Sequence, residues 1–164
     1  MKPYKVLAVA SGGGHWVQLF RMRMSWNGCV VAYVTTNKDH KRAVMSDSSC
    51  RGQPAPRFYN VVSADRWTKL RLVQQALQVL IIVLKERPDV VISSGAALGV
   101  WAILFSRCLG ARAAWVDSIA NAQKLSLSGK IAGRLSNLWL TQWKHLEGCE
   151  SSATGRPIYR GSVV

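Results

Sequence analysis

A run of glycines ending in a histidine, Ser11-Gly12-Gly13-Gly14-His15, is the segment of this 164-residue chain that best fits ligand chemistry. It follows the apolar run at residues 6–10 and precedes an amphipathic segment at 16–24, so we expect a strand, a turn and a helix. Glycines let backbone amides approach a ligand closely, and a helix N-terminus favours an anion such as phosphate. His15 adds a titratable imidazole there. The alternative is that the glycines serve only close packing of the strand and the helix.

A second glycine turn, Ser93-Ser94-Gly95, links another apolar strand to an apolar helix. Two such turns at one edge of a sheet predict a ligand with two phosphates, bound by Gly12, Gly13 and Gly14 together with Ser94 and Gly95. Neither turn is a known nucleotide motif, because residues 12–14 lack the third glycine of GxGxxG. Residues 128–130 are followed by isoleucine where a P-loop needs serine or threonine. Both observations weaken the ATPase and dinucleotide interpretations.

Two titratable residues that follow predicted strands, His15 and Asp117, could form an acid/base pair. Asp117 follows the apolar run at 113–116, and ligands bind at the carboxyl ends of strands in a doubly wound sheet, where His15 also lies. His15 and Asp117 are therefore candidate catalytic residues. Aspartate is also an ordinary helix N-cap, so a purely structural role for Asp117 stays open.

Six short strands are expected near residues 6–10, 30–34, 58–62, 90–93, 113–116 and 138–141, with helical patterns between most of them. Several are continuous apolar runs, as in parallel sheets covered on both faces. The sequence thus predicts an α/β fold with a Rossmann-like parallel sheet, formed by residues 1–164 as a single domain. Residues 37–57 are expected to form a surface excursion around a short helix. Residues 150–164 are expected to form either an edge strand or a partner-docking tail, with Tyr159, Gly161 and Val163 as the docking residues.

The predicted helix at residues 66–87 carries more apolar surface than one sheet face can cover. Leu70, Val73, Leu77, Leu80 and Leu84 form one stripe, and a second stripe lies beside it. Basic residues flank these stripes, which is typical of helices on anionic membrane surfaces. The alternative is a buried helix with solvated basic ends. The candidate membrane-surface residues, including those that end the first helix, are Arg21, Arg23, Trp26, Arg66, Trp67, Lys69 and Arg71.

Composition narrows the partners without choosing one. The chain has 22 Lys plus Arg against 8 Asp plus Glu, a net charge of +14, which favours nucleic acid, an anionic membrane or a phosphorylated substrate. Four cysteines without a CxxC pair suggest no metal site and no disulfide framework, and Cys29 and Cys108 are expected in the core. No cofactor is expected. The apolar runs are too short for a signal peptide or a membrane span, so a cytosolic or peripheral protein is expected.

Five motifs in order carry a family resemblance: SGGGH at 11–15, the run at 86–96, WVDS at 115–118, SGK at 128–130 and LTQW at 140–143. Together they resemble the acceptor-side subunit of split GT-B glycosyltransferases. That family includes the membrane-anchoring subunit of the UDP-N-acetylglucosamine transferase of asparagine-linked glycosylation, and bacterial PssD-like and CpsF-like polysaccharide proteins. The resemblance covers nearly the whole chain.

The resemblance implies the N-terminal, Rossmann-like half of a GT-B enzyme. A separate small catalytic subunit would carry most of the nucleotide-sugar site and dock on the tail. The pair would transfer a sugar to a polyprenyl-diphosphate-linked acceptor in exopolysaccharide or capsule synthesis, at the cytoplasmic face of the inner membrane. The glycine turn with His15 would contact the acceptor diphosphate. A nucleic-acid-binding protein, ranked low because the basic residues are dispersed, and a stand-alone nucleotide-dependent transferase are the alternatives.

Overall fold

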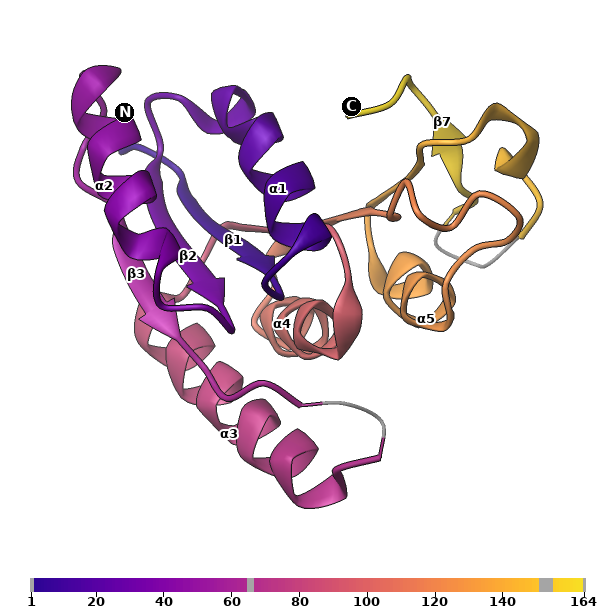
Figure 1. Ribbon diagram of the computed structural model, residues 1–164, viewed down its shortest axis with the longest axis horizontal. Helices are drawn as coiled ribbons and strands as arrows, with labels where there is room; N and C mark the ends of the chain where they lie inside the picture. Colours follow the sequence, from indigo (N-terminus) through magenta and orange to yellow (C-terminus); the bar gives the residue numbers. More distant parts are fainter. Residues whose placement is uncertain (1, 65–66, 151–154, 164) are drawn as a thin grey trace.

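A single parallel sheet organises the computed structural model, which describes residues 2–64, 67–150 and 155–163 (Figure 1). Its strand order is β3-β2-β1-β4-β5-β6-β7, and every neighbouring pair is parallel. The strands are β1 (Lys5–Ala10), β2 (Val30–Thr35), β3 (Arg57–Asn60), β4 (Val90–Ser93), β5 (Arg112–Val116), β6 (Leu138–Thr141) and β7 (Ile158–Tyr159). The predicted Rossmann-like sheet is confirmed, with one added edge strand.

Helices cover both faces of this sheet (Figure 1). On one face lie α1 (Gly14–Arg21), the 3-10 helix η1 (Met22–Trp26) and α2 (His40–Cys50). On the other lie α3 (Lys69–Glu86), α4 (Ala96–Cys108) and α5 (Leu127–Leu135). A short 3-10 helix, η2 (Lys144–Leu146), precedes β7.

The central strand shows why the apolar runs are continuous. In β1, Leu7 and Val9 are buried among side chains of α3 and α4, while Ala8 and Ala10 are buried beneath α1. Both faces of the strand are therefore covered, which removes the alternation of polar and apolar residues. The carboxyl ends of β1 and its neighbour β4 consequently lie side by side and position the two glycine turns.

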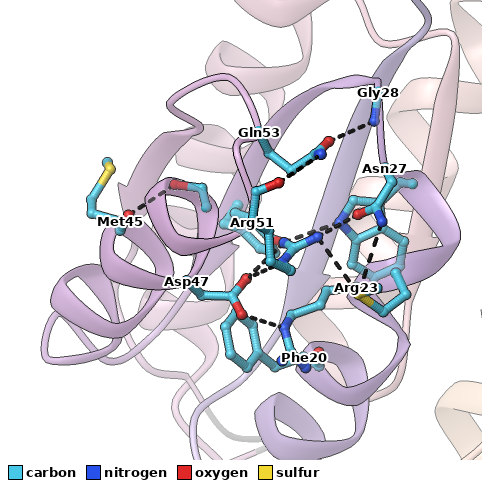
Figure 2. A network of polar contacts seen from close by, with 12 residues as sticks. Phe20, Arg23, Asn27, Gly28, Met45, Asp47, Arg51 and Gln53 are labelled. Atoms are coloured by element: carbon cyan, nitrogen blue, oxygen red, sulfur yellow. Dashed lines mark hydrogen bonds and ion pairs between the residues drawn. The ribbon is translucent and has the colours of Figure 1, made fainter.

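Polar contacts tie α2 to η1 (Figure 2). The Asp47 carboxylate accepts hydrogen bonds from Arg23 at 2.7 Å and Arg51 at 2.8 Å, and the Arg23 guanidinium lies 4.7 Å from the centre of the Phe20 ring. Burial alone would raise the pKa of Asp47, but hydrogen bonds and charge from Arg51 and Arg23 hold it below its ordinary value. Within the excursion predicted at residues 37–57, residues 40–50 form α2, the expected short helix. This helix is packed on the sheet, with Val44 in the core.

The same contacts correct two membrane-surface predictions. Arg23 forms an ion pair with Asp47, and its side chain is 29% exposed. Trp26 is buried and donates from Nε1 to the Tyr33 hydroxyl at 3.0 Å. Both side chains hold the protein together rather than facing a membrane. The first helix ends at Arg21, since η1 follows it, and Arg21 itself stays exposed.

The end of α3 is fixed by a buried acid. The Glu86 carboxylate binds Arg57 and the Tyr59 hydroxyl, so α3 is held against β3. Burial, followed by the hydrogen bond to Glu86, raises the pKa of Tyr59 to about 12.

The core placement predicted for Cys108 is wrong, because this residue lies exposed at the last position of α4. Cys29, also expected in the core, is half-buried.

Candidate functional site

The two glycine turns are joined by His15 and Ser94. The His15 Nδ1 donates to the Ser94 carbonyl oxygen at 3.0 Å, and the Ser94 hydroxyl donates to the His15 carbonyl at 2.7 Å. A carbonyl only accepts, so the proton of the neutral imidazole lies on Nδ1 and the lone pair on Nε2. No described residue binds this Nε2. The histidine is therefore held in a tautomer that can accept a proton at Nε2.

The helices that leave these turns have open N-termini. The N-cap residues of α1 and α4 are Gly13 and Gly95; neither makes a side-chain cap, and neither helix has an acidic residue in its first turn. By contrast, Ser126 caps α5 and accepts from the Gly129 amide at 2.8 Å. The first amides of α1 and α4, with the positive ends of two helix dipoles, are thus available to an anionic ligand.

The glycines of the first turn (residues 11–15) do not share one role. The Gly12 amide already donates to the Thr36 hydroxyl at 2.9 Å, so this residue fastens the turn to the end of β2. Gly13 and Gly14 are exposed, and Gly13 has a φ of 76°, which glycine adopts without steric cost. The backbone amides that remain available for a ligand are therefore those from Gly13 onward.

The second turn (residues 93–97) mainly positions the histidine. Ser94 is 0% exposed, and both its hydroxyl and its carbonyl are hydrogen-bonded to His15, so its side chain does not face a ligand as its prediction among the diphosphate-binding residues requires. Gly95 is buried as well, and a Cβ there would lie 2.2 Å from the His15 Nδ1. The partly exposed part of this turn is Ala96 and Ala97, and Ala96 is held at a φ of 65°.

Asp117 is a structural residue in this arrangement. It is 2% exposed and accepts from the Ser126 hydroxyl at 2.8 Å, the Ser126 amide at 3.1 Å and the Asn121 side chain at 3.0 Å. No hydrogen bond joins it to His15 in the described parts of the chain. The predicted acid/base pair is therefore not formed, because Asp117 is occupied in shaping the turn that leads into α5.

Sequence reasoning missed Gln18, which lies one turn after His15 on α1. Its Oε1 accepts from the Gln142 side chain at 2.8 Å and the Ile119 amide at 3.3 Å, and its Nε2 donates to the Ser118 hydroxyl at 3.2 Å. Gln18 thus ties the helix of His15 to the ends of β5 and β6. The available signal was a glutamine on the buried side of an amphipathic helix, between Trp16 and Leu19.

The tail lies along its own sheet. Ile158 and Tyr159 pair with β6, which corresponds to the edge-strand alternative, and the Tyr159 amide donates to Glu147 at 3.2 Å. Further on, Gly161 is exposed, whereas the Val163 amide donates to the Gln142 side chain at 2.7 Å. The tail therefore reaches the polar cluster around Gln18.

No other described element covers the outer face of α3 (Figure 1), and large apolar side chains are exposed on it. Its exposed residues include Leu70 at 87% and Leu77 at 55%, and together they form the outer stripe: Leu70, Val73, Leu77, Ile81 and Leu84. On the inner side, Gln75 donates to the Val62 carbonyl and Val79 is buried. One predicted stripe is thus core and the other is surface.

The candidate membrane-surface residues at the start of α3 are exposed where the structure describes them. Trp67 is 80% exposed, and Lys69 and Arg71 are exposed, whereas Arg66 lies outside the described residues. No helix in the described ranges is both long enough and apolar enough to cross a bilayer.

Comparisons with solved structures show what the fold resembles. Among solved structures, the chain is similar to MurG of Acinetobacter baumannii, with a TM-score of 0.72 and 12% identity over 99% of this chain and 46% of that one. It is also similar to the UDP-GlcNAc 2-epimerase of Neisseria meningitidis, solved bound to UDP-GlcNAc, with a TM-score of 0.68 and 13% identity over 97% and 47%. A third similar structure is S. aureus MnaA, solved with UDP. Its TM-score is 0.67, with 13% identity over 98% of this chain and 45% of that one.

These likenesses concern the fold, and the chain spans less than half the length of each of these proteins. No curated protein sequence matches it. The fold is that of the N-terminal half of GT-B enzymes such as MurG. The family model of the oligosaccharide biosynthesis proteins like Alg14 matches residues 6–156 of this chain. These residues include both glycine turns and most of the sheet. The chain therefore belongs to the Alg14-like family of oligosaccharide biosynthesis proteins.

Proposed function

We propose that the chain is the acceptor-binding accessory subunit of a two-component, inverting glycosyltransferase. It binds a polyprenyl-diphosphate-linked acceptor in exopolysaccharide or capsule synthesis, while a small catalytic subunit binds the nucleotide sugar. The observation that carries the proposal is the pair of open helix N-termini joined through His15. Membership of the Alg14-like family supports an accessory role in the assembly of lipid-linked oligosaccharides.

The site residues divide the chemistry between binding and proton transfer. Amides of α1 from Gly13 onward and of α4 from Ala96 onward bind the acceptor diphosphate, which is favoured by both helix dipoles. His15 accepts at Nε2 the proton of the acceptor hydroxyl as its oxygen bonds to the sugar C1. The bond from C1 to the nucleotide diphosphate breaks at the same time, and the nucleotide leaves with that electron pair.

The nucleotide-sugar site is assigned to the partner. The chain spans less than half the length of the solved proteins that it resembles, and one of those, a UDP-GlcNAc 2-epimerase, was solved bound to UDP-GlcNAc. We propose that the partner docks at the tail through Tyr159, Gly161 and Val163, beside Gln142.

A reconstitution experiment tests this division of labour. The purified chain and a small subunit resembling the C-terminal half of a GT-B enzyme are assayed separately and together, with a UDP-sugar and a polyprenyl-diphosphate-linked acceptor in detergent. We expect transfer only with both subunits. A transfer rate typical of a complete enzyme from the chain alone would overturn the proposal in favour of a stand-alone transferase.

Membrane association is assigned to the outer stripe together with Lys69 and Arg71 at the start of α3. Arg21 lies on α1, on the other face of the sheet, and is not part of this surface. We propose a peripheral position at the cytoplasmic face of the inner membrane, where anionic lipids attract the +14 chain. An exposed tryptophan, Trp67, lies next to the stripe, and this residue type favours the membrane interface.

Replacing Leu70 and Leu77 by serine tests this surface. Both side chains are exposed, so we expect little change in the free energy of unfolding. Each leucine that enters the interface contributes about 1.5 kcal/mol or more, so binding to anionic vesicles should fall about tenfold for each substitution. Leu127→Ser, at a position on α5 whose exposure of 74% lies between those of Leu70 and Leu77, is the control in a vesicle sedimentation assay. Equal losses for the control and the α3 variants would contradict the assignment.

A further inference from the structure

A cleft of about 840 Å³ lies at the amino edge of the sheet, opposite the glycine turns. Its walls come from the chain before β1, the end of α3 and the turn between α4 and β5. Leu84 belongs both to this cleft and to the outer stripe of α3, so the two surfaces are continuous. The other lining residues used below are Tyr4, Arg87, Asp89, Leu109 and Arg112.

The cleft is lined by more basic than acidic side chains. Arg87 and Arg112 are exposed there, and neither guanidinium makes an ion pair within the described ranges. The acid of the cleft, Asp89, accepts from the Lys5 amide at 2.8 Å, and the Lys5 side chain is directed to the Glu86 carbonyl at 3.3 Å. The two arginines are therefore available to an anionic group.

Arg87 is held in a backbone conformation that favours glycine. It follows the last residue of α3 with φ 45° and ψ 65°, the left-handed conformation in which helices commonly end with glycine. An arginine at this position costs free energy that glycine would avoid. The buried Glu86, bound to Arg57 and Tyr59, fixes the helix end immediately before it. A strained residue with an unpaired charge at the mouth of a cleft indicates a binding role.

We propose that this cleft binds the phosphate headgroup of an anionic phospholipid, with Arg87 and Arg112 as the phosphate ligands. The inference rests on the membrane association proposed above. Guanidinium groups bind phosphate oxygens in a bidentate manner, and Leu84 and Leu109 offer apolar contact to the lipid beyond its headgroup. The occupant is a lipid rather than a free phosphate because one wall of the cleft continues into the apolar stripe.

The placement of the cleft gives α3 an orientation on the membrane. Lys69 and Arg71 lie at the start of the helix and the cleft at its end, and the stripe from Leu70 to Leu84 between them is about 21 Å long. A helix with basic groups at both ends and leucines between them lies in the plane of the membrane. The glycine turns are then kept near the surface that holds the acceptor lipid.

Vesicle binding by Arg87→Gly and Arg112→Gln tests the cleft. Sedimentation is measured with vesicles of phosphatidylcholine alone and of phosphatidylcholine with an equal part of phosphatidylglycerol. On the anionic vesicles we expect about a fivefold loss for each variant and about 25-fold for both together. Arg87→Gly should also unfold at the same or a higher temperature than the wild type, because glycine relieves the left-handed backbone.

Arg42→Ala is the control for net charge, since Arg42 is exposed on α2 on the other face of the sheet. The cleft is refuted if Arg42→Ala weakens binding as much as Arg87→Gly, which would indicate a general effect of charge. It is also refuted if glycerol phosphate occupies the arginine cleft without displacing the chain from the vesicles, because the cleft would then bind a soluble phosphate and not the lipid headgroup. If the wild type binds no anionic vesicle, the membrane association itself fails. If Arg87→Gly and Arg112→Gln bind as the wild type does, only the cleft fails.

Discussion

Replacing His15 by alanine is expected to lower sugar transfer by the reconstituted pair about 10²- to 10⁴-fold, the usual contribution of a positioned general base. The imidazole is held by its Nδ1 on the Ser94 carbonyl, which leaves Nε2 free for the acceptor hydroxyl. Alanine removes both the proton acceptor and the side-chain hydrogen bond to the Ser94 carbonyl, one of the two links between the glycine turns. The measurement is the steady-state rate at saturating UDP-sugar and acceptor, in detergent, with the folded state verified by circular dichroism.

His15→Asn separates these two losses. The asparagine side-chain amide can still donate to the Ser94 carbonyl, as Nδ1 does, but it has no basic nitrogen in the place of Nε2. If His15 is the base, asparagine and alanine variants lose activity alike. If asparagine restores most of the rate, His15 only positions the turns, and the proton acceptor must be sought in the partner or in the acceptor itself.

A single methyl group at Gly95 is expected to have an effect of similar size. A Cβ there would lie 2.2 Å from the Nδ1 and 2.3 Å from the Cε1 of His15, and Gly95 has a φ of 151°. Gly95→Ala must therefore displace either the second turn or the imidazole. Since a misplacement of about 1 Å can cost about 100-fold in rate, we expect at least that loss of transfer activity. We also expect about 1–3 kcal/mol off the free energy of unfolding, measured by urea denaturation.

The control for Gly95→Ala is Gly28→Ala. Gly28 has a φ of 79°, but a Cβ there would meet no atom within 4 Å, so the substitution adds backbone strain without a clash. It should lower stability modestly and leave the transfer rate unchanged. In the double variant His15→Ala/Gly95→Ala the clash disappears, so the two losses of stability should not add. Additive losses would show that the imidazole is not what Gly95 accommodates.

Most of the sheet could be predicted because its strands are short apolar runs buried on both faces. The pattern located β4 (Val90–Ser93) and β6 (Leu138–Thr141) at their observed bounds. Helix ends were harder to predict. The first helix changes to a 3-10 helix after Arg21, and α3 starts at Lys69 rather than at residue 66. These ends depend on local backbone bonds that residue type alone does not determine.

The site was predictable in position and less so in the role of each residue. Both glycine turns lie together as expected, because parallel strands place their carboxyl ends at one edge. Which polar group faces a ligand depends on partners far away in sequence. Ser94 is occupied by His15, 79 residues earlier, and Asp117 by Ser126 and Asn121. Trp26 illustrates the same limit, since its buried partner, Tyr33, cannot be recognised from composition.

The open ends of α1 and α4 also link ligand occupancy to folding. In the unfolded chain these amides are spread along a flexible backbone, so the diphosphate ligand that we propose is expected to bind only the native state. Binding then adds RT ln(1 + [L]/Kd) to the stability, about 2.7 kcal/mol at a ligand concentration one hundred times Kd. A melting curve of the isolated chain, without partner or chemistry, therefore becomes a way to rank candidate acceptors by how far each raises the midpoint.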